Sequence, residues 1–155
     1  MITPQWIQKQ DDLFDIAADI RHNVFVIEQK CDPNLEIDEF DADAIHLLAM
    51  HGDDCIGTGR IFKYNDSYHM GRICVLSEYR NMNFGYDIVK SLCDKVFKID
   101  ADTKILIHAQ KYVEHFYEKF GFTSYGDIFF EENIPHIKME LTLNNYSQSN
   151  TKAYK

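Results

Sequence analysis

The chain has 155 residues, of which 45% are hydrophobic and 14% aromatic, and its formal net charge at pH 7 is −9. A chain of this length typically forms one domain with its own core, and the composition excludes an intrinsically disordered protein. The acidic balance argues against nucleic-acid binding, which needs a basic surface, and no apolar run approaches the roughly 18 residues that a membrane span needs.

The N-terminus and the cysteines bear on the compartment. Residues 1–5 lack the basic start and apolar stretch of a signal peptide, so we expect a cytoplasmic protein. Cys31, Cys55, Cys74 and Cys93 are far apart and form no CxxC pair, so we expect neither a disulfide framework nor a zinc site. Cys74 and Cys93 fall on predicted apolar faces, where cysteine acts as a small hydrophobic residue.

The first part of the chain is predicted to form a strand over residues 2–9 and then a helix over about 13–25, whose apolar residues recur at helical spacing. Residues 28–43 follow, with seven acids against one lysine, and are predicted to form a loop or short helical turns. A block this acidic is usually a solvated loop, but it can also be a rim that attracts a cationic substrate. Both interpretations stay open.

Three consecutive strands are predicted next. The apolar runs 44–50 and 55–64 are separated by His51-Gly52-Asp53-Asp54, which is a good hairpin signal. A second turn at Asn65-Asp66-Ser67 leads to a third strand over residues 68–76. These segments are therefore expected to pair as antiparallel neighbours.

The period of the apolar residues changes after Arg80. From Phe84 to Phe97 they form one stripe, which predicts an amphipathic helix. A strand over 105–109 and a helix over about 112–120, stopped by Gly121, come next. Two closing strands are expected at 122–125 and 137–143.

This order of elements predicts an α+β fold, a mixed α/β sandwich whose central sheet is mostly antiparallel and is flanked by helices. The strand–helix–strand unit over about 68–109 favours one parallel pair with a right-handed crossover. We expect a single domain over residues 1–143. Residues 144–155 are polar and are predicted to be a disordered tail.

The turn that enters the predicted helix at Phe84 is the strongest candidate for a ligand site. A helix N-terminus leaves backbone N–H groups unpaired and has a partial positive charge. Consecutive free N–H groups at such a turn bind anions, phosphates among them. One arginine and one glycine at a helix start also fit an ordinary capped loop, so this pattern alone is not decisive.

The wider pattern resembles the acetyl-CoA motif of the GNAT superfamily of acetyltransferases, Arg/Gln-x-x-Gly-x-Gly/Ala. Arg80 and Gly85 match its ends, and Asn83 stands in place of its middle glycine. A second motif of the family, Asn-x-x-Ala-x-x-x-Tyr-x-x-x-Gly-Phe, is matched at its later positions by Tyr117, Gly121 and Phe122 and not at the positions of Gln110 and Val113.

Segments at both ends of the chain resemble the ElaA-like (YjcF-like) branch of the superfamily. They are Arg21 with Val24–Gln29; Glu36, Asp38, Asp41 and His46; and Phe130–His136. The resemblance spans about residues 5–143. It implies the GNAT fold and an N-acetyltransferase that uses acetyl-CoA as co-substrate and no metal.

The resemblance also implies which residues hold the cofactor. Backbone N–H groups of the loop would hold the pyrophosphate, Arg80 would position the loop or reach a phosphate, and a backbone N–H near Val75 or Leu76 would face the thioester carbonyl. The whole cofactor set is Ile73, Cys74, Val75, Arg80, Asn81, Met82, Asn83, Phe84, Gly85 and Gln110. Asn tolerates the positive φ that glycine adopts, so the loop is expected to survive at Asn83 with weaker cofactor binding.

For catalysis, Tyr117 occupies the family position of the general acid, which hydrogen-bonds or protonates the departing thiolate. The acceptor amine must lose a proton to a base. The candidate bases are Glu28, Asp38, Asp41, His46, Glu131 and His136, and we favour His136, whose side chain titrates in the right range, with Glu131 on the same late segment. Alternatively, His136, Glu131 and Tyr117 have structural roles only. The acceptor-binding candidates are Glu28, Asp38, Asp41 and His46.

The favoured hypothesis is an enzyme that acetylates a small-molecule or protein amine by direct transfer. A GNAT-fold sensor that binds acyl-CoA without turnover is the main alternative, and a structural or partner-binding domain is a third. No nucleic-acid or membrane partner is expected, and a homodimer is possible.

Overall fold

The computed structural model describes residues 1–153, with side chains up to residue 149. The chain folds into a mixed, mostly antiparallel sheet with one parallel pair and helices on its faces, so the predicted fold class is confirmed. The seven strands follow the order β1-β2-β3-β4-β5-β7-β6. Contacts divide the chain into two compact units, which we call the N-terminal unit (Met1–Phe62 with Met70–Asp94) and the C-terminal unit (Lys63–His69 with the chain from Lys95 onward).

The sheet of the N-terminal unit contains the predicted hairpin. Its strands are β1 (Thr3–Ile7), β2 (Ile45–His51), β3 (Asp54–Tyr64) and most of β4 (Ser67–Val75). β2 pairs antiparallel with both β1 and β3. Gly52 has a φ of +63° in the turn between β2 and β3, the left-handed conformation that glycine favours. The predicted boundaries of these four strands are thus correct to within two residues at every end.

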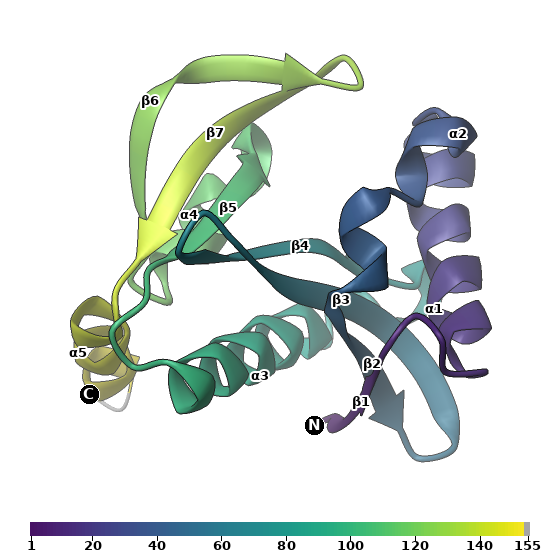
Figure 1. The fold of residues 1–155 in the computed structure, drawn as a ribbon, viewed down its shortest axis with the longest axis horizontal. Helices are drawn as coiled ribbons and strands as arrows, with labels where there is room; N and C mark the ends of the chain where they lie inside the picture. The colour runs from purple at the N-terminus through teal and green to yellow at the C-terminus, as the bar shows by residue number, and fades with distance from the viewer. Residues whose placement is uncertain (154–155) are drawn as a thin grey trace. The chain divides into compact units, whose positions relative to one another are not determined.

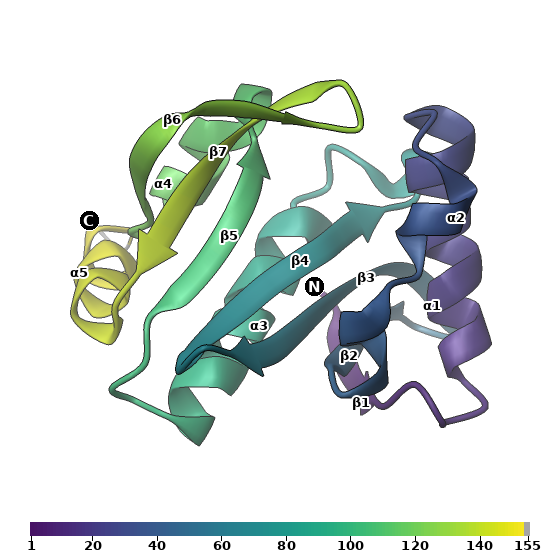
Figure 2. The same cartoon turned by 45° about the horizontal axis from the view of Figure 1, so that its top comes forward.

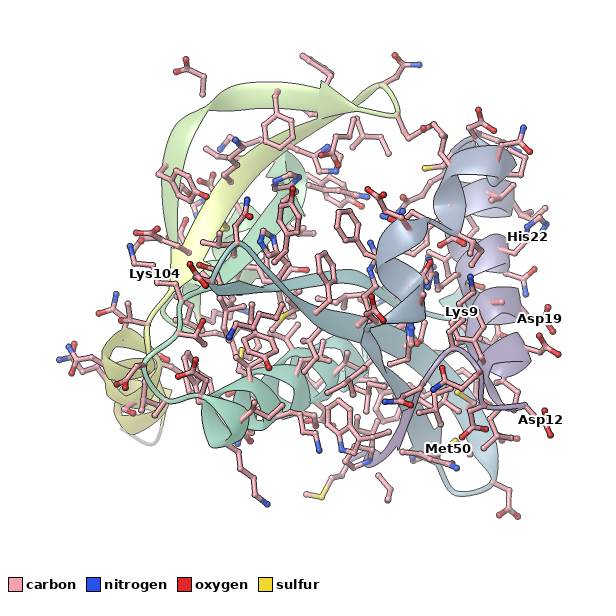
Figure 3. The ribbon with its side chains drawn as sticks, in the orientation of Figure 1. Lys9, Asp12, Asp19, His22, Met50 and Lys104 are labelled. Carbon is pink, nitrogen blue, oxygen red and sulfur yellow. The ribbon has the colours of Figure 1, made fainter. Side chains whose placement is uncertain are left out.

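Two helices cover opposite faces of this sheet (Figure 1). Helix α1 (Phe14–Arg21) packs Phe14 and Ala17 against Leu48 of β2. Helix α3 (Phe84–Ile99) lies over Gly59, where an added Cβ atom would be 2.8 Å from Leu92 of the helix. Opposite faces are used because successive residues of a strand point to opposite sides of a sheet. Asp19 and His22 lie on the outer side of the first helical segment (Figure 3).

The acidic segment forms short helical turns, as predicted. Helix α1 continues as a π-helical segment, η1 (His22–Glu28), and two short turns follow, α2 (Pro33–Glu36) and η2 (Glu39–Ala42). The carboxylates of Asp32 and Asp38 accept hydrogen bonds from backbone N–H groups at the starts of these turns. Aspartate caps a helical turn in this way because its oxygens satisfy N–H groups that have no partner within the turn.

The C-terminal unit contains the strands β5 (Ile105–Gln110), β6 (Thr123–Glu131) and β7 (Ile134–Leu141), with the turn η4 (Lys111–Val113) and the helix α4 (Glu114–Glu118). β7 lies between the other two strands and is antiparallel to both. Figure 2 shows the long hairpin that β6 and β7 form. Both strands extend further into this hairpin than the predicted segments 122–125 and 137–143.

The prediction of a disordered tail is wrong for residues 144–153. They form α5 (Leu143–Ala153). Tyr146 is buried beside Phe97, with 5.6 Å between the ring centroids, and the Ser149 hydroxyl donates a hydrogen bond to the Phe120 carbonyl. Packing of these few residues holds the helix in spite of its polar composition. Residues 154 and 155 of the predicted tail lie outside the described residues.

None of the helices within residues 1–153 is long and apolar enough to cross a bilayer.

Candidate active site

The loop between β4 and α3 has the geometry of an anion-binding turn. Asn81 and Asn83 have φ values of +64° and +65°, and the helix begins at Phe84. Among residues 1–153, none accepts a hydrogen bond from the backbone N–H groups of residues 81–85. Positive and negative φ values that alternate along a turn direct successive N–H groups toward one side, where they bind an anion. Asn83 therefore supplies the conformation for which the family motif uses glycine.

Arg80 holds the start of this loop. Its Nε donates to the Val75 carbonyl at 3.0 Å, and its guanidinium binds both carboxylate oxygens of Glu28 at 2.8 and 3.0 Å. This two-pronged geometry fixes the planar guanidinium more firmly than one contact can. Glu28, a predicted acceptor-binding residue, is thus brought to the predicted cofactor loop.

The last residues of β4 precede the loop. Ile73 and Val75 are half-buried, while Cys74 is buried, and burial raises the pKa of its thiol to about 12. The prediction that Cys74 packs as a small hydrophobic residue is confirmed, as it is for the fully buried Cys93.

The Leu76 N–H donates to the Ile56 carbonyl at 2.9 Å. The Leu76 N–H is therefore used within the sheet. Of the two N–H groups predicted to face the thioester carbonyl, the Val75 N–H is the remaining candidate.

Asp41 lies in a buried network of charges in the N-terminal unit. Its carboxylate accepts from Arg21 at 2.8 and 3.1 Å and from Arg60 at 2.7 Å, and it has no exposed surface. Burial acts to raise the pKa of Asp41, but the hydrogen bonds and charges of the two arginines outweigh it and lower the pKa below its ordinary value. Such a carboxylate holds the fold together and is not presented to an acceptor.

Asp38 and His46 belong to the same network. Asp38 binds Arg60 at 2.6 and 2.9 Å and Arg72 at 3.2 Å. Although burial acts to raise its pKa, the arginines lower it. The buried His46 ring donates from Nε2 to the Asp41 carbonyl at 3.0 Å, and burial lowers the pKa of His46.

Of the four predicted acceptor-binding residues, Glu28 and Asp38 keep exposed surface. Sequence reasoning did not connect Arg21, Arg60 and Arg72 with these acids, because the arginines come from distant segments.

Tyr117 lies on α4, half-buried between two aromatic rings. Phe116 and Phe122 approach it edge to face, with centroids 5.2 and 5.8 Å away. These contacts fix the direction of the phenol. Gln110 is the last residue of β5, directly opposite His136 of β7.

His136 and Glu131 lie near each other at the β6–β7 hairpin. His136 Nε2 is 3.9 Å from Glu131 Oε2, and Glu131 Oε1 is 2.7 Å from Nδ1 of His108. His108 was not among the predicted residues. Its position on β5, two residues before Gln110, puts both side chains on one face of the strand, and this period-2 spacing is the signal that could have found it.

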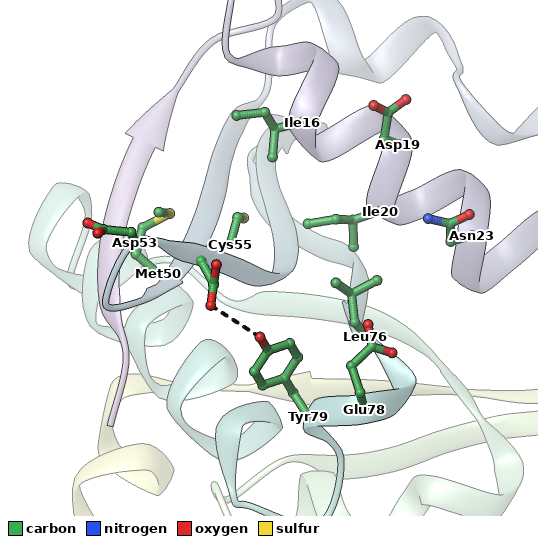
Figure 4. Close-up of a pocket in the computed structure, with 11 residues that line it drawn as sticks. Ile16, Asp19, Ile20, Asn23, Met50, Asp53, Cys55, Leu76, Glu78 and Tyr79 are labelled. Carbon is green, nitrogen blue, oxygen red and sulfur yellow. Dashed lines mark hydrogen bonds between the residues drawn. The ribbon is translucent and has the colours of Figure 1, made fainter.

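A pocket of about 430 Å³ lies between α1, the β2–β3 turn and the segment after β4 (Figure 4). Its apolar wall includes Ile16, Ile20 and Leu76. Asp54 accepts a hydrogen bond from the Tyr79 hydroxyl at 3.3 Å, and the charge of Asp54 raises the pKa of Tyr79. No group of three or more potential metal ligands occurs in the part of the chain that the structure describes.

Comparison with known proteins decides the family. The model of the acetyltransferase (GNAT) domain matches residues 23–143. The chain belongs to the GNAT acetyltransferase family. It is therefore an enzyme of the N-acetyltransferase type, and the predicted superfamily is confirmed.

Relatives of this GNAT protein agree with the predicted branch. The uncharacterized N-acetyltransferase YjcF of Bacillus subtilis is 31% identical over 135 residues, which cover 86% of this chain and 95% of YjcF. The crystal structure of Escherichia coli ElaA has a TM-score of 0.80 and 27% identity over 90% of this chain and 99% of ElaA. An acyl-CoA N-acyltransferase from Pseudomonas aeruginosa has a TM-score of 0.80 and 25% identity over 90% and 99% of the two chains.

Proposed function

We propose that this GNAT enzyme transfers the acetyl group of acetyl-CoA directly to a primary amine on a small molecule or a protein. The proposal rests chiefly on the five backbone N–H groups of residues 81–85, which no described residue engages. They precede a helix of 16 residues, whose partial positive charge favours a bound anion. A diphosphate has the charge and the oxygens for such a turn. The similar Pseudomonas protein is named as a user of acyl-CoA.

On the donor side, the residues of the chain bind and orient. Acetyl-CoA supplies an acetyl thioester, whose acetyl group goes to the amine while the CoA thiol is released. The amides of the loop hold the diphosphate, and Arg80 keeps the loop on the end of β4 through its contact with Val75. The Val75 N–H serves as hydrogen-bond donor to the carbonyl oxygen, where negative charge develops during transfer.

Tyr117 is proposed as the general acid. Thiolates are better leaving groups when a nearby hydroxyl stabilises the charge or delivers a proton. The edge-to-face contacts of Phe116 and Phe122 with Tyr117 limit how far its ring can turn. The hydroxyl is therefore held in one direction before the donor binds.

His136 and Glu131 are proposed as the groups that take the proton from the acceptor amine. At pH 7 an alkylamine with a pKa of about 10.4 is almost wholly protonated, so a base must accompany transfer. Asp38 and Glu28 are proposed to attract the cationic amine from the surface. Asp41 and His46 are buried, and their proposed role is to hold Asp38 in place.

Release of free thiol from acetyl-CoA, measured with a panel of amines, tests this function. We expect thiol release that depends on one class of amine. A rise in apparent melting temperature with acetyl-CoA reports binding separately, because a ligand that binds the native state stabilises it. Binding without thiol release for any amine would indicate the sensor instead, and no binding would leave only a structural or partner-binding role.

A further inference from the structure

The proton of the His136 ring is assigned by its partner. His136 Nδ1 is 2.7 Å from the carbonyl oxygen of Ile134. A carbonyl oxygen only accepts hydrogen bonds, so Nδ1 must carry the hydrogen. In the neutral ring the lone pair is then on Nε2. Nε2 is consequently the atom of His136 that can take a proton.

The two oxygens of Glu131 have different neighbours. Oε1 is 2.7 Å from Nδ1 of His108, and Oε2 is 3.9 Å from Nε2 of His136. His108 Nδ1 donates to the carboxylate, since an ionised carboxylate only accepts. One hydrogen bond from β5 therefore turns the other oxygen of Glu131 toward the basic nitrogen of His136.

We propose that the acceptor amine binds between His136 Nε2 and Glu131 Oε2, and that His108 is a positioning residue that holds Glu131 for this contact. Both atoms are hydrogen-bond acceptors, and 3.9 Å is too long for a bond between them. A nitrogen about 2.8 Å from each atom completes a triangle and can donate one hydrogen to each. This inference rests on the proposed transfer to an amine.

The arrangement accounts for the proton. A primary ammonium donates one N–H to Glu131 and a second to His136. The second N–H bond breaks and an Nε2–H bond forms on His136, which leaves the lone pair on the amine nitrogen. That pair forms the bond to the acetyl carbon while the carbon–sulfur bond breaks and its electrons leave with sulfur. The nitrogen is positively charged once this bond forms, and it loses a second proton as the thiolate takes one up to become the free CoA thiol. The negative charge of Glu131 stabilises the imidazolium that His136 becomes.

Other groups complete the surroundings of this cluster. The Phe129 ring lies 5.1 Å from the His108 ring and 5.8 Å from the His136 ring, with the Lys138 ammonium 5.9 Å from its centroid. On β4, His69 has its pKa lowered by burial, and to a smaller extent by the charge of His108. Glu131 supplies a negative charge beside the His108 and His136 rings, so a cationic amine is directed to it.

Substitutions at His108 test the positioning role. We expect His108→Leu to lower kcat/KM for the amine about tenfold, because a general base that is no longer held in place loses part of its usual contribution to the rate. The affinity for acetyl-CoA should not change. His108→Asn retains an N–H donor near the position of Nδ1 and should restore kcat/KM to within about threefold of the original enzyme. The matched control is His115→Leu, because His115 also pairs with a glutamate, Glu118, but is 93% exposed.

The pH profile separates positioning from a general loss of structure. His108→Leu should change the acidic limb of kcat/KM, where the base becomes protonated, and leave the melting temperature within about 3 °C of the original. Normal kcat/KM in His108→Leu, or a loss that His108→Asn does not restore, overturns the positioning role.

A spectroscopic measurement keeps this inference distinct from the proposed function. Nitrogen-15 shifts of labelled histidine should show the proton of neutral His136 on Nδ1, and n-propylammonium chloride should perturb Nε2 in the original protein but not in Glu131→Gln. A proton on Nε2, or the same perturbation in both proteins, overturns the amine site. Failure of thiol release with every amine, together with the expected nitrogen-15 result, overturns the proposed function alone.

Discussion

Arg21 and Asp41 form a buried ion pair, with Nη1 of the guanidinium 2.8 Å from Oδ1 of the carboxylate. The arginine is the last residue of α1, and the aspartate lies in η2. Arg60 of β3 binds the same carboxylate at 2.7 Å. One carboxylate thus joins a helix, a loop turn and a strand, so the acidic segment is fixed to the sheet by charge as well as by packing.

Asp41→Asn should destabilise the fold at pH 7 by about 3 kcal/mol, because it removes the buried charge that Arg21 and Arg60 share. Arg21 then keeps its pair with Glu36, and Arg60 keeps its pair with Asp38. The folded pKa of Asp41 is lowered, so its stabilisation is present above the unfolded pKa of about 3.9 and is lost as the pH falls further. Urea unfolding between pH 7 and pH 2.5 measures both effects.

The unfolding free energies of the original protein and Asp41→Asn should differ in their dependence on pH in the acidic range. Between pH 4 and pH 2.5 the original protein should lose more stability than Asp41→Asn. Asp94→Asn is the control, because Asp94 pairs with Lys90 on the exposed side of a helix, and its loss should cost no more than about 0.5 kcal/mol. Parallel pH curves for the original protein and Asp41→Asn would contradict the assignment.

This network marks a limit of sequence-based prediction. The acids of residues 28–43 could be read only as a solvated loop or as an acidic rim. Arg60 is 19 positions from Asp41 and 22 from Asp38, and no local pattern links residues so far apart. Elements defined by apolar periodicity, such as the helix from Phe84, were predictable because burial of one face imposes the period.

The conformation of the loop at Asn83 could be anticipated in part. The match to the family motif put a glycine-like residue there, and asparagine tolerates positive φ. Asn83→Gly should bind acetyl-CoA at least as tightly as the original protein. Asn83→Val should weaken binding about tenfold, because a β-branched residue at a φ of +65° is strained by about 1–2 kcal/mol. Isothermal titration calorimetry measures both changes.

The control for this prediction is Asn65→Val, at another asparagine with positive φ, 50°, in the turn between β3 and β4. It should lower stability by a similar amount and leave the affinity for acetyl-CoA unchanged. Equal affinities for Asn83→Val and Asn65→Val would show that the conformation at Asn83 does not matter for the cofactor.

Tyr117→Phe should lower kcat by about a hundredfold and change the acetyl-CoA dissociation constant less than twofold, because it removes the hydroxyl and keeps the ring. Its contacts with Phe116 and Phe122 are retained, so the melting temperature should stay the same. The matched variant is Tyr112→Phe, at a tyrosine that is 73% exposed. Steady-state kinetics with the best amine of the panel decide the matter, and an unchanged kcat removes Tyr117 from the mechanism.

The close approach of α5 to Gly121 offers a test of how this helix is held. The glycine was recognised only as the stop of the preceding helix, but its φ is +103° and an added Cβ atom would be 2.6 Å from the Asn145 carbonyl oxygen of α5. Gly121→Ala should therefore cost about 3 kcal/mol in unfolding free energy, from backbone strain and from displacement of α5. Gly52→Ala also has positive φ, +63°, but no atom within 4 Å, and should cost about 1 kcal/mol. Urea unfolding gives both values, and limited proteolysis should cut α5 faster in Gly121→Ala alone; equal losses in the two variants would mean that this close approach contributes nothing.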